Sequence, residues 1–522
     1  YEREGIDCLH LLRGEFSFTL YDARKELLFL VRDRFGIKPL YYTCTNGTFL
    51  FASEIKAILA YPGVPRAVDE TAFYHYLSFL TTPAPSTLFK GIMKLPSGCY
   101  AKLNNSGLVE TRRYWDVLDH TMPLVGISEE EIAARLLEEL RSAVRYRKVS
   151  DVPVGVFLSG GVDSSVNTVL FSEGETKPVK TFSIGYEREY ETYGNEFEYA
   201  QIIADLVKAD HHEKRLKVDD FIDFLPKLIY HQDEPIADPV CVPVYYLSKL
   251  ARENGVVVCQ VGEGSDELFC GYPGWKVSLR LQKLSNLPLT LPFKKMGLFF
   301  LRCIGQEQAN SYEWLRRGAS AEPVFWGGAE AFNEGEKKIL LSERLNKQFR
   351  NYSSFEAIEP ILERFNNKAW ERTPLNWMSY LDLNFRLPEL LLMRVDKMSM
   401  ATSLEARVPF LDHKFVELSM SIPESVKTKN GELKGILKKA VRGIIPKKII
   451  ERKKQGFNVP VREWFFEKLG GYAEEKINKF TERTDFLDKL YVKGLFERGK
   501  NQKLWYLLNF VLWHESWIER SN

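Results

Sequence analysis

The sequence predicts an α/β protein in which an antiparallel β segment precedes a larger part built around a parallel sheet. Up to about residue 115, short alternating or apolar runs follow one another with turn residues between them, which is typical of antiparallel sheets. Beyond that point strand-like runs alternate with helical ones, which implies crossover connections and a parallel sheet covered by helices on both faces. We therefore expect two domains, residues 1–115 and residues 116–522.

Composition indicates an ordinary globular chain. Of its 522 residues, 45% are hydrophobic and 27% are charged, and the formal net charge is only +2. Such a balance produces no strong field toward nucleic acid or an anionic membrane. The seven cysteines form no CxxC motif, and no stretch approaches 18 apolar residues. We expect a cytoplasmic protein without a nucleic-acid or membrane partner, and the oligomeric state stays open, a homodimer included.

Six strands are expected in the N-terminal segment, at 16–21, 27–31, 39–43, 48–52, 98–103 and 108–114. Asn46-Gly47 separates the third strand from the fourth, and this dipeptide is the strongest short signal for a two-residue hairpin turn. We expect Cys8, Cys44 and Cys99 within or beside strands of this segment.

The larger part begins with a predicted helix. Ser128 followed by three glutamates is typical of a capped helix start, and the helix should run to about Arg147. Residues 275–375 are expected to be helical, and the chain from 376 onward mainly helical with two loop motifs. The predicted parallel strands are 152–158, 179–184, 212–216 and 256–261.

The first of these strands leads into a glycine-rich loop. Its sequence is Ser159-Gly160-Gly161-Val162-Asp163-Ser164-Ser165, and a helix follows. Two glycines let backbone N–H groups approach an anion, and the helix N-terminus adds unpaired donors. Asp163 could hold Mg²⁺ on a polyphosphate. The alternative is a simple strand-to-helix turn capped by Asp163.

An acidic loop follows the last predicted strand. Gly262 begins it, and Glu263, Asp266 and Glu267 supply carboxylates. These suit a metal–polyphosphate partner or acid–base chemistry, although an acidic helix start is the alternative. Since the carboxyl ends of parallel strands share one edge of a sheet, both loops can face one crevice.

Three further motifs carry charge. The run 394–412 mixes both signs with apolar residues, as the wall of a pocket would, and the run 452–457 brings cations toward a loop glycine. A solvated charged helix explains each equally well. The run 494–501 has P-loop spacing, but Asn501 replaces the hydroxyl residue and no strand precedes it, so we expect a helix and its end there.

The motifs SGGVDSS, VGEGSDELF, LEARVPFLD and RKKQGF, in this order, resemble those of the glutamine-dependent asparagine synthetases. Residues 12–18, 32–42 and 51–57 are similar to the second half of that family's glutaminase domain, a class II amidotransferase domain of the Ntn type. The resemblance implies part of a glutaminase-like antiparallel segment, followed by a parallel-sheet pyrophosphatase-loop synthetase domain with a helical C-terminal part.

The resemblance also implies a reaction. ATP would activate the aspartate side-chain carboxylate as β-aspartyl-AMP, and ammonia, supplied directly or from glutamine, would displace AMP. ATP and Mg²⁺ are the implied cofactors. The alternative is a relative acting on another carboxylate, such as a sugar acid or a β-lactam precursor. The β-lactam-forming branch has Tyr at the position of Glu263, so this glutamate favours asparagine formation.

Roles follow for the matching residues. Glu263 would support formation of the intermediate and the attack by ammonia, and Lys454 would stabilise the departing pyrophosphate. Asp163 and Asp266 would hold Mg²⁺, and Glu405 and Arg407 would shape the substrate pocket. The nucleotide would be bound through its pyrophosphate by Ser159, Gly160, Gly161, Asp163, Ser164 and Ser165, and through its adenosine by Phe157, Leu158, Ile184, Val261 and Gly262.

Three departures from the family pattern stand out. The printed chain begins at Tyr1, so we expect about 100 residues of the glutaminase half to be absent from it, the catalytic cysteine and the glutamine-carboxylate site included. Cys270 stands where the family usually has Gly. Val261 replaces a frequent small hydroxyl residue, a change that keeps backbone contacts.

Overall fold

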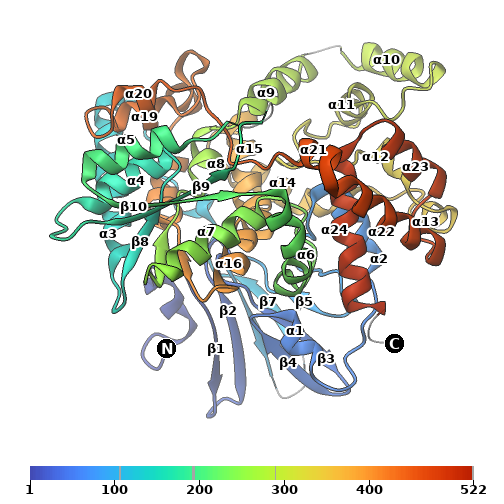
Figure 1. The fold of residues 1–522 in the computed structure, drawn as a ribbon, viewed down its shortest axis with the longest axis horizontal. Helices are drawn as coiled ribbons and strands as arrows, with labels where there is room; N and C mark the ends of the chain where they lie inside the picture. Colours follow the sequence, from blue (N-terminus) through green and yellow to red (C-terminus); the bar gives the residue numbers. More distant parts are fainter. Residues whose placement is uncertain (105–106, 108, 191–193, 288–289, 520–522) are drawn as a thin grey trace.

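The N-terminal segment folds into two antiparallel sheets, as predicted (Figure 1). The computed structural model describes residues 1–104, 107, 109–190, 194–287 and 290–519. One sheet has the strand order β1-β2-β6-β7 and the other the order β4-β3-β5. The strands are β1 (Ser17–Asp22), β2 (Leu27–Arg32), β3 (Tyr41–Thr45), β4 (Thr48–Ala52), β5 (Met93–Lys94), β6 (Cys99–Leu103) and β7 (Val109–Arg113).

Local details of this segment follow the sequence with one exception. Thr45 pairs with Thr48, and both Asn46 and Gly47 have positive φ, so the predicted two-residue hairpin turn is confirmed. Cys44 lies in β3 and Cys99 begins β6, but Cys8 lies in the short 3₁₀ helix η1 (Gly5–Leu11), where no strand-like alternation exists to place it in a sheet. The predicted strand at 108–114 is β7, and residue 108 itself lies outside the described residues.

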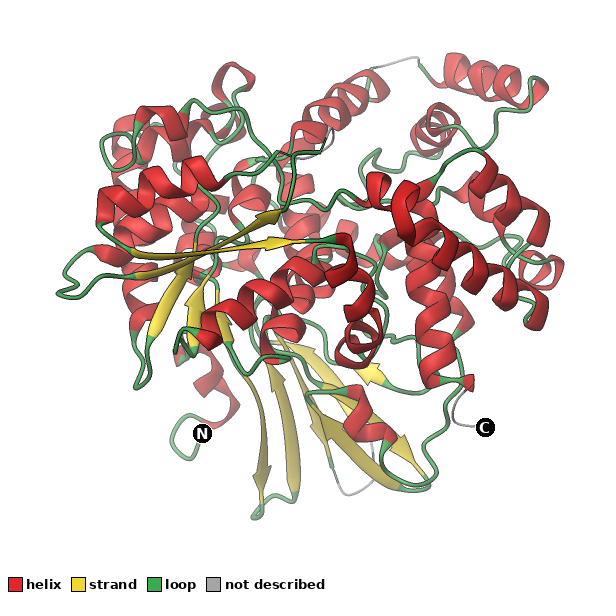
Figure 2. Cartoon of the chain, in the orientation of Figure 1, coloured by secondary structure: helices red, strands yellow, loops and turns green. Residues whose placement is uncertain are grey.

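The larger part contains a five-stranded sheet with the order β10-β9-β8-β11-β12, and every neighbouring pair is parallel (Figure 2). Four strands were predicted, whereas β12 lies in the motif at 404–412 that we expected to be a loop. Three residues are too few for any periodicity to show a strand. The strands are β8 (Val154–Phe157), β9 (Lys180–Tyr186), β10 (Asp210–Leu216), β11 (Val258–Gln260) and β12 (Glu405–Arg407).

Helices cover the parallel sheet in two groups. Helix α4 (Val162–Ser172) contacts both α3 (Glu129–Lys148) and α5 (Phe197–Val207), and α4 and α5 contact strands β8 to β10. Helices α6, α7 and α16 form the second group, in which α7 contacts β9 and β10 and α16 contacts β12. Figure 1 shows α4 and α5 on one side of the strands and α7 and α16 on the other. Buried on both faces, the strands bring their carboxyl ends to one edge.

The remaining helices follow the helical pattern of the sequence. Ser128 caps the first long helix through a hydrogen bond from the Glu131 backbone N–H, 3.2 Å long. None of the helices within the described ranges is both long and apolar enough to span a bilayer. The helices are α1 (Ile55–Leu59), α2 (Glu70–Phe79), α3 (Glu129–Lys148), α4 (Val162–Ser172), α5 (Phe197–Val207), α6 (Val218–Gln232), α7 (Cys241–Glu253), α8 (Ser265–Phe269), α9 (Pro273–Ser285), α10 (Leu291–Cys303), α11 (Asn310–Ala319), α12 (Glu334–Leu340), α13 (Glu343–Gln348), α14 (Glu359–Lys368), α15 (Pro374–Asn384), α16 (Leu392–Met400), α17 (His413–Met420), α18 (Glu424–Lys427), α19 (Gly435–Ala440), α20 (Lys447–Ile450), α21 (Val461–Trp464), α22 (Gly470–Arg483), α23 (Lys489–Glu497) and α24 (Asn501–Trp517).

Residues distant in sequence join the two parts. The Arg13 guanidinium donates to Asp412 at 2.9 Å, and Glu15 accepts a hydrogen bond from the Val408 backbone N–H at 2.9 Å. At the other end of the chain, the buried helix α24 packs against α2, where the rings of Phe73 and Phe510 lie 4.3 Å apart. Contacts with segments far along the chain therefore hold the N-terminal part against the larger part.

Candidate active site

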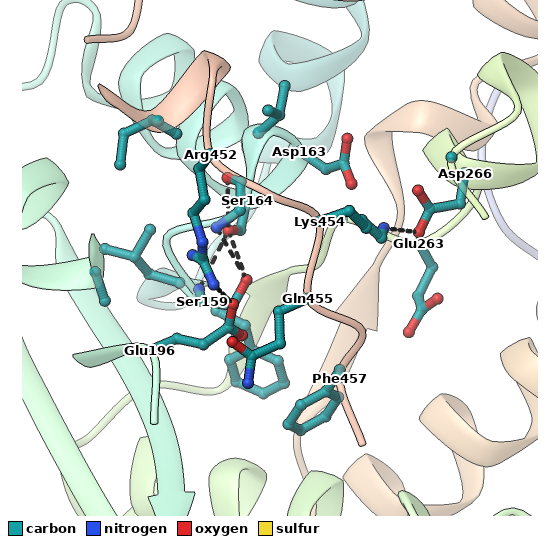
Figure 3. A pocket seen from close by; sticks show the side chains of 18 of the residues that line it. Ser159, Asp163, Ser164, Glu196, Glu263, Asp266, Arg452, Lys454, Gln455 and Phe457 are labelled. Atoms are coloured by element: carbon teal, nitrogen blue, oxygen red, sulfur yellow. Dashed lines mark hydrogen bonds and ion pairs between the residues drawn. The ribbon is translucent and has the colours of Figure 1, made fainter. Parts of the chain in front are cut away.

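The loop after β8 and the first turn of α4 form one wall of a cavity of about 430 Å³ (Figure 3). Gly160 has φ of +71°, and a Cβ there would lie 2.5 Å from Tyr199, so only glycine fits. Ser164 Oγ accepts a hydrogen bond from the Ser159 backbone N–H, 3.1 Å long, which closes the loop over the helix start. Gly161 precedes the first turn of α4, so the open N–H groups of that turn face a cavity that can accept an anion.

A lysine joins the carboxylates of the two loops. Lys434 Nζ lies 2.5–2.6 Å from both oxygens of Asp163 and 2.5 Å from one oxygen of Asp266. Lys454 forms an ion pair with the other oxygen of Asp266. Burial alone would raise the pKa of Asp266, but Lys434 and Lys454 hold it below its ordinary value. Burial likewise opposes the charge on Lys434, and the two aspartates hold its pKa above the ordinary value. The Asp266 carboxylate is therefore ionised at neutral pH.

Glu263 lies at the same edge, directly after β11. The backbone of Gly262 passes so close to α4 that a Cβ there would lie 3.3 Å from Asp163 Cβ. Arg394, from α16, donates to Glu263 at 2.7 Å and to Asp238 at 2.6 Å. The Arg394 side chain is 8% exposed and that of Glu263 is 24% exposed. A buried cation thus fixes a carboxylate that still reaches the cavity.

A second ion pair forms the opposite wall. Arg452 pairs with Glu196 and donates to the carbonyl oxygen of Gly160 at 3.1 Å. Figure 3 shows this pair across the cavity from Lys454 and Asp266. Burial raises the pKa of Glu196 to about 7, although Arg452 acts to lower it. Arg452, which holds the glycine-rich loop through Gly160, is therefore itself paired with a carboxyl group whose pKa lies near 7.

The other end of the cavity is apolar. The backbone N–H of Leu158 donates to the Phe182 carbonyl at 2.9 Å, and Ser183 Oγ donates to the Leu158 carbonyl, so β8 and β9 stay paired to their ends. A flat ring with polar edges fits such a surface, because side chains supply apolar contact and strand ends supply backbone groups. The apolar lining is made by Phe157, Leu158, Phe182, Ile184, Phe197, Val244, Leu247 and Phe457.

Most of the predicted site residues line this cavity, and four do not. Gly160 and the buried Ser165 support the loop from behind. Glu405 and Arg407 lie outside the cavity, because β12 directs them to each other at 2.8 Å and Arg407 also donates to the Val149 carbonyl at 2.7 Å. The residues that do line it are Phe157, Leu158, Ser159, Gly161, Asp163, Ser164, Ile184, Val261, Gly262, Glu263, Asp266 and Lys454.

Comparison with known proteins fits this geometry. The family model for asparagine synthase matches residues 135–515, and the model for a glutamine amidotransferase domain matches residues 1–115. The chain belongs to the asparagine synthase family. Glutamine-hydrolyzing asparagine synthetase 1 of Bacillus subtilis is 32% identical over all of this chain and 80% of the relative. Glutamine-hydrolyzing asparagine synthetase 3 of the same bacterium is 30% identical over 86% of this chain, and amidase chyE of Penicillium rubens is 27% identical over 92%.

Asparagine synthases perform ATP-dependent amidation, and the cavity contains charged residues that the sequence did not single out for it. Lys434 lies in a lysine-rich run with no feature that distinguishes it from its neighbours. Glu196 follows the undescribed residues 191–193 without any motif. Arg394 and Arg452 lie in the charged motifs at 394–412 and 452–457. Each contacts a residue that the sequence did single out, Glu263 and Gly160 respectively. A search of those motifs for cations that could pair with the two loops would have identified both arginines. Gly494 lies within α23 and Asn501 begins α24, so the P-loop lookalike is a helix and its end, as predicted.

Two carboxylates of the asparagine synthase cavity suit a metal ion. Among the described residues, no group of three or more His, Cys, Asp and Glu side chains is arranged to hold an ion. Mg²⁺ needs less, because one or two carboxylates and the oxygens of a polyphosphate suffice. Asp163 and Asp266 supply two carboxylates that face the same cavity and share one cation, Lys434. These residues therefore fit Mg²⁺ bound together with a nucleotide.

Proposed function

We propose that this cavity converts aspartate to asparagine through β-aspartyl-AMP, with ammonia or glutamine as the nitrogen donor. One observation carries the proposal: the glycine-rich loop, the two lysine-bridged aspartates and Glu263 line a single cavity with an apolar end. The family membership supports ATP-dependent amidation in general. The asparagine synthetases among the relatives support aspartate as the acceptor.

Each residue then has a role in binding. The adenine ring lies at the apolar end, against Phe157 and Ile184, and the pyrophosphate part of ATP lies over the loop from Ser159 to Ser164. Asp163 and Asp266 hold Mg²⁺, which would neutralise charge on the polyphosphate when bound. Lys454 then faces the departing pyrophosphate and stabilises its charge by a fixed cation. Together these groups favour a leaving pyrophosphate rather than transfer of the terminal phosphate.

The chemistry takes place beside Glu263. An oxygen of the aspartate side-chain carboxylate attacks the α-phosphorus of ATP, and the bond to pyrophosphate breaks. Ammonia then attacks the acyl carbon, AMP leaves with one of the original carboxylate oxygens, and the nitrogen gives up a proton. Glu263, held by Arg394 at 2.7 Å, is the side chain positioned to accept that proton.

Isotope transfer tests the mechanism. Aspartate labelled with ¹⁸O in its side-chain carboxylate should pass label to AMP, with unlabelled pyrophosphate as the other product. Glu263→Gln should slow this transfer about 10²–10³-fold, the usual cost of one preorganised charged group, whereas Glu263→Asp should retain part of it. Glu405→Gln is the matched control, because Glu405 lies outside the cavity and should leave the rate unchanged.

Two outcomes would contradict the proposal in different ways. ADP and labelled inorganic phosphate as products would exclude adenylation. AMP formation with another carboxylic acid, and none with aspartate, would keep adenylation but move the substrate to the alternative acid.

A further inference from the structure

Helix α10 exposes a row of large apolar side chains. Phe293, Met296, Phe300 and Ile304 follow a spacing of three or four residues, so they lie on one face of the helix. Phe299, beside this row, is 70% exposed, and Phe293 is 68% exposed. Isolated exposed apolar residues are normal, but a contiguous stripe of this kind marks an interaction site. We call these five residues the apolar stripe.

The side of α10 next to this stripe is the one that packs. Gly297 approaches Leu315 of α11, so that a Cβ there would lie 3.0 Å from the leucine side chain. Lys294 donates to the carbonyls of Ser285 and Gly318, at 2.6 and 3.1 Å, which attaches the helix to its neighbours. Figure 1 places α10 at the edge of the molecule, away from the N-terminal sheets. The helix is therefore fixed by one face and presents its apolar stripe outward.

The segment that contains the stripe is rich in cations. Residues 273–306 contain no aspartate or glutamate and six cations, although the whole chain has a net charge of only +2. The net charge of the whole chain predicts no anionic membrane partner. That prediction does not take a local excess of cations into account, because a sum over 522 residues does not show it. The six are Lys276, Arg280, Lys283, Lys294, Lys295 and Arg302. Of these, Lys276 also lines the active-site cavity, Lys294 donates to backbone carbonyls, and Arg302 pairs with Glu307 at 3.0 Å.

We propose that α9 and α10 bind the surface of an anionic phospholipid bilayer. An apolar stripe bordered by cations is the signature of a helix that lies in the headgroup region. With 13 residues, α10 is about 20 Å long, too short to cross a bilayer but long enough to lie in its surface. A symmetric contact between two copies of this helix is disfavoured, since it would place the cations of each copy against those of the other.

Vesicle pelleting with the full chain tests this proposal, which does not depend on the identity of the substrate. The protein should pellet with vesicles that contain phosphatidylglycerol and phosphatidylcholine, and not with phosphatidylcholine alone. Binding should weaken as salt is added, because exposed charges are screened. The double variant Phe293→Gln/Phe300→Gln should bind about 100-fold more weakly, since each exposed ring contributes about tenfold when buried. Lys283→Gln/Lys295→Gln should lose about 30-fold.

A matched control separates this site from general stickiness. Phe466→Gln/Leu490→Gln removes two side chains that are 72% and 80% exposed elsewhere, and it should bind like the unchanged protein. All variants should release pyrophosphate from ATP at the unchanged rate in the absence of vesicles. Equal binding to both kinds of vesicle, or equal loss in the control, would overturn the proposal. So would self-association that the Phe293→Gln/Phe300→Gln variant abolishes without any vesicle binding, because the occupant would then be a second copy.

Discussion

Lys94 and Lys434 are both buried lysines that bridge two carboxylates, yet their surroundings differ. Lys94 lies 2.9 Å from Glu234 and 3.0 Å from Glu389, and it also donates to the Thr82 carbonyl at 2.8 Å. Its two carboxylate side chains are 4% and 3% exposed. The carboxylates that Lys434 bridges are 17% and 18% exposed, and they face the cavity.

The difference separates structure from function. An enclosed ion pair has no room for a further ligand, so it contributes only to the free energy of unfolding. An ion pair whose carboxylates face a cavity can bind a metal ion or a polyphosphate, so its loss reduces the rate of turnover. Burial and bridging geometry alone do not distinguish the two.

The largest expected effect is on stability, at Lys94. Lys94→Met leaves two buried carboxylates without their cation, which typically costs about 3–5 kcal/mol. We expect the free energy of unfolding from denaturant titration to fall by that amount, while pyrophosphate release per folded molecule stays within about twofold. A tenfold fall in that release would break the comparison by giving Lys94 a part in catalysis.

The next effect is on turnover, at Lys434. Lys434→Met should reduce pyrophosphate release about 100-fold, because Asp163 and Asp266 lose the cation that sets their separation. The loss of stability should be smaller than for Lys94→Met, since water in the cavity can solvate the aspartates. Lys447→Met, at a side chain 82% exposed, is the control and should change neither quantity. A larger loss of stability at Lys434 than at Lys94 would contradict the distinction.

The third effect depends on pH, at Glu196. Because burial raises the pKa of Glu196 to about 7, the folded chain keeps a proton that the unfolded chain releases above about pH 4.5. The stability from this group is therefore fully present below pH 4.5 and is lost as the pH rises to about 7, with a slope of at most about 1.4 kcal/mol per pH unit. Glu196→Gln should remove that slope from melting curves recorded between pH 5 and 7.

The control for this pH effect lies two residues away. Glu198 pairs with Lys448 on the surface, and its side chain is 72% exposed. Glu198→Gln should keep the slope of the unchanged protein. If both variants kept it, Glu196 would not be the titrating group.

The fold and the two loops could be predicted from sequence because their signals are local. Glycine spacing and a preceding apolar run placed Ser159 and Glu263 at strand ends without any tertiary information. Lys434 could not be found in this way, since its importance comes from partners 271 and 168 residues distant, Asp163 and Asp266. The role of Glu405 stays a prediction: a motif indicated that the segment matters, but the structure pairs this side chain with Arg407, apart from the residues that line the cavity, and a three-residue strand has no periodicity that could show this.

Strand β12 has a consequence for how the chain reaches its native state during synthesis. Its register with β11 pairs Val258 with Glu405, and the adjoining Val408 and Asp412 contact Glu15 and Arg13. At ordinary rates of translation, about 20–80 s separate the appearance of residue 13 from that of residue 412. For that time Arg13 and Glu15 lack their partners Asp412 and Val408, and for the shorter interval between residues 258 and 405, about 7–30 s, the edge of β11 lacks β12. The growing sheet therefore leaves the ribosome without β12, and it stays incomplete until nearly four-fifths of the chain has been made.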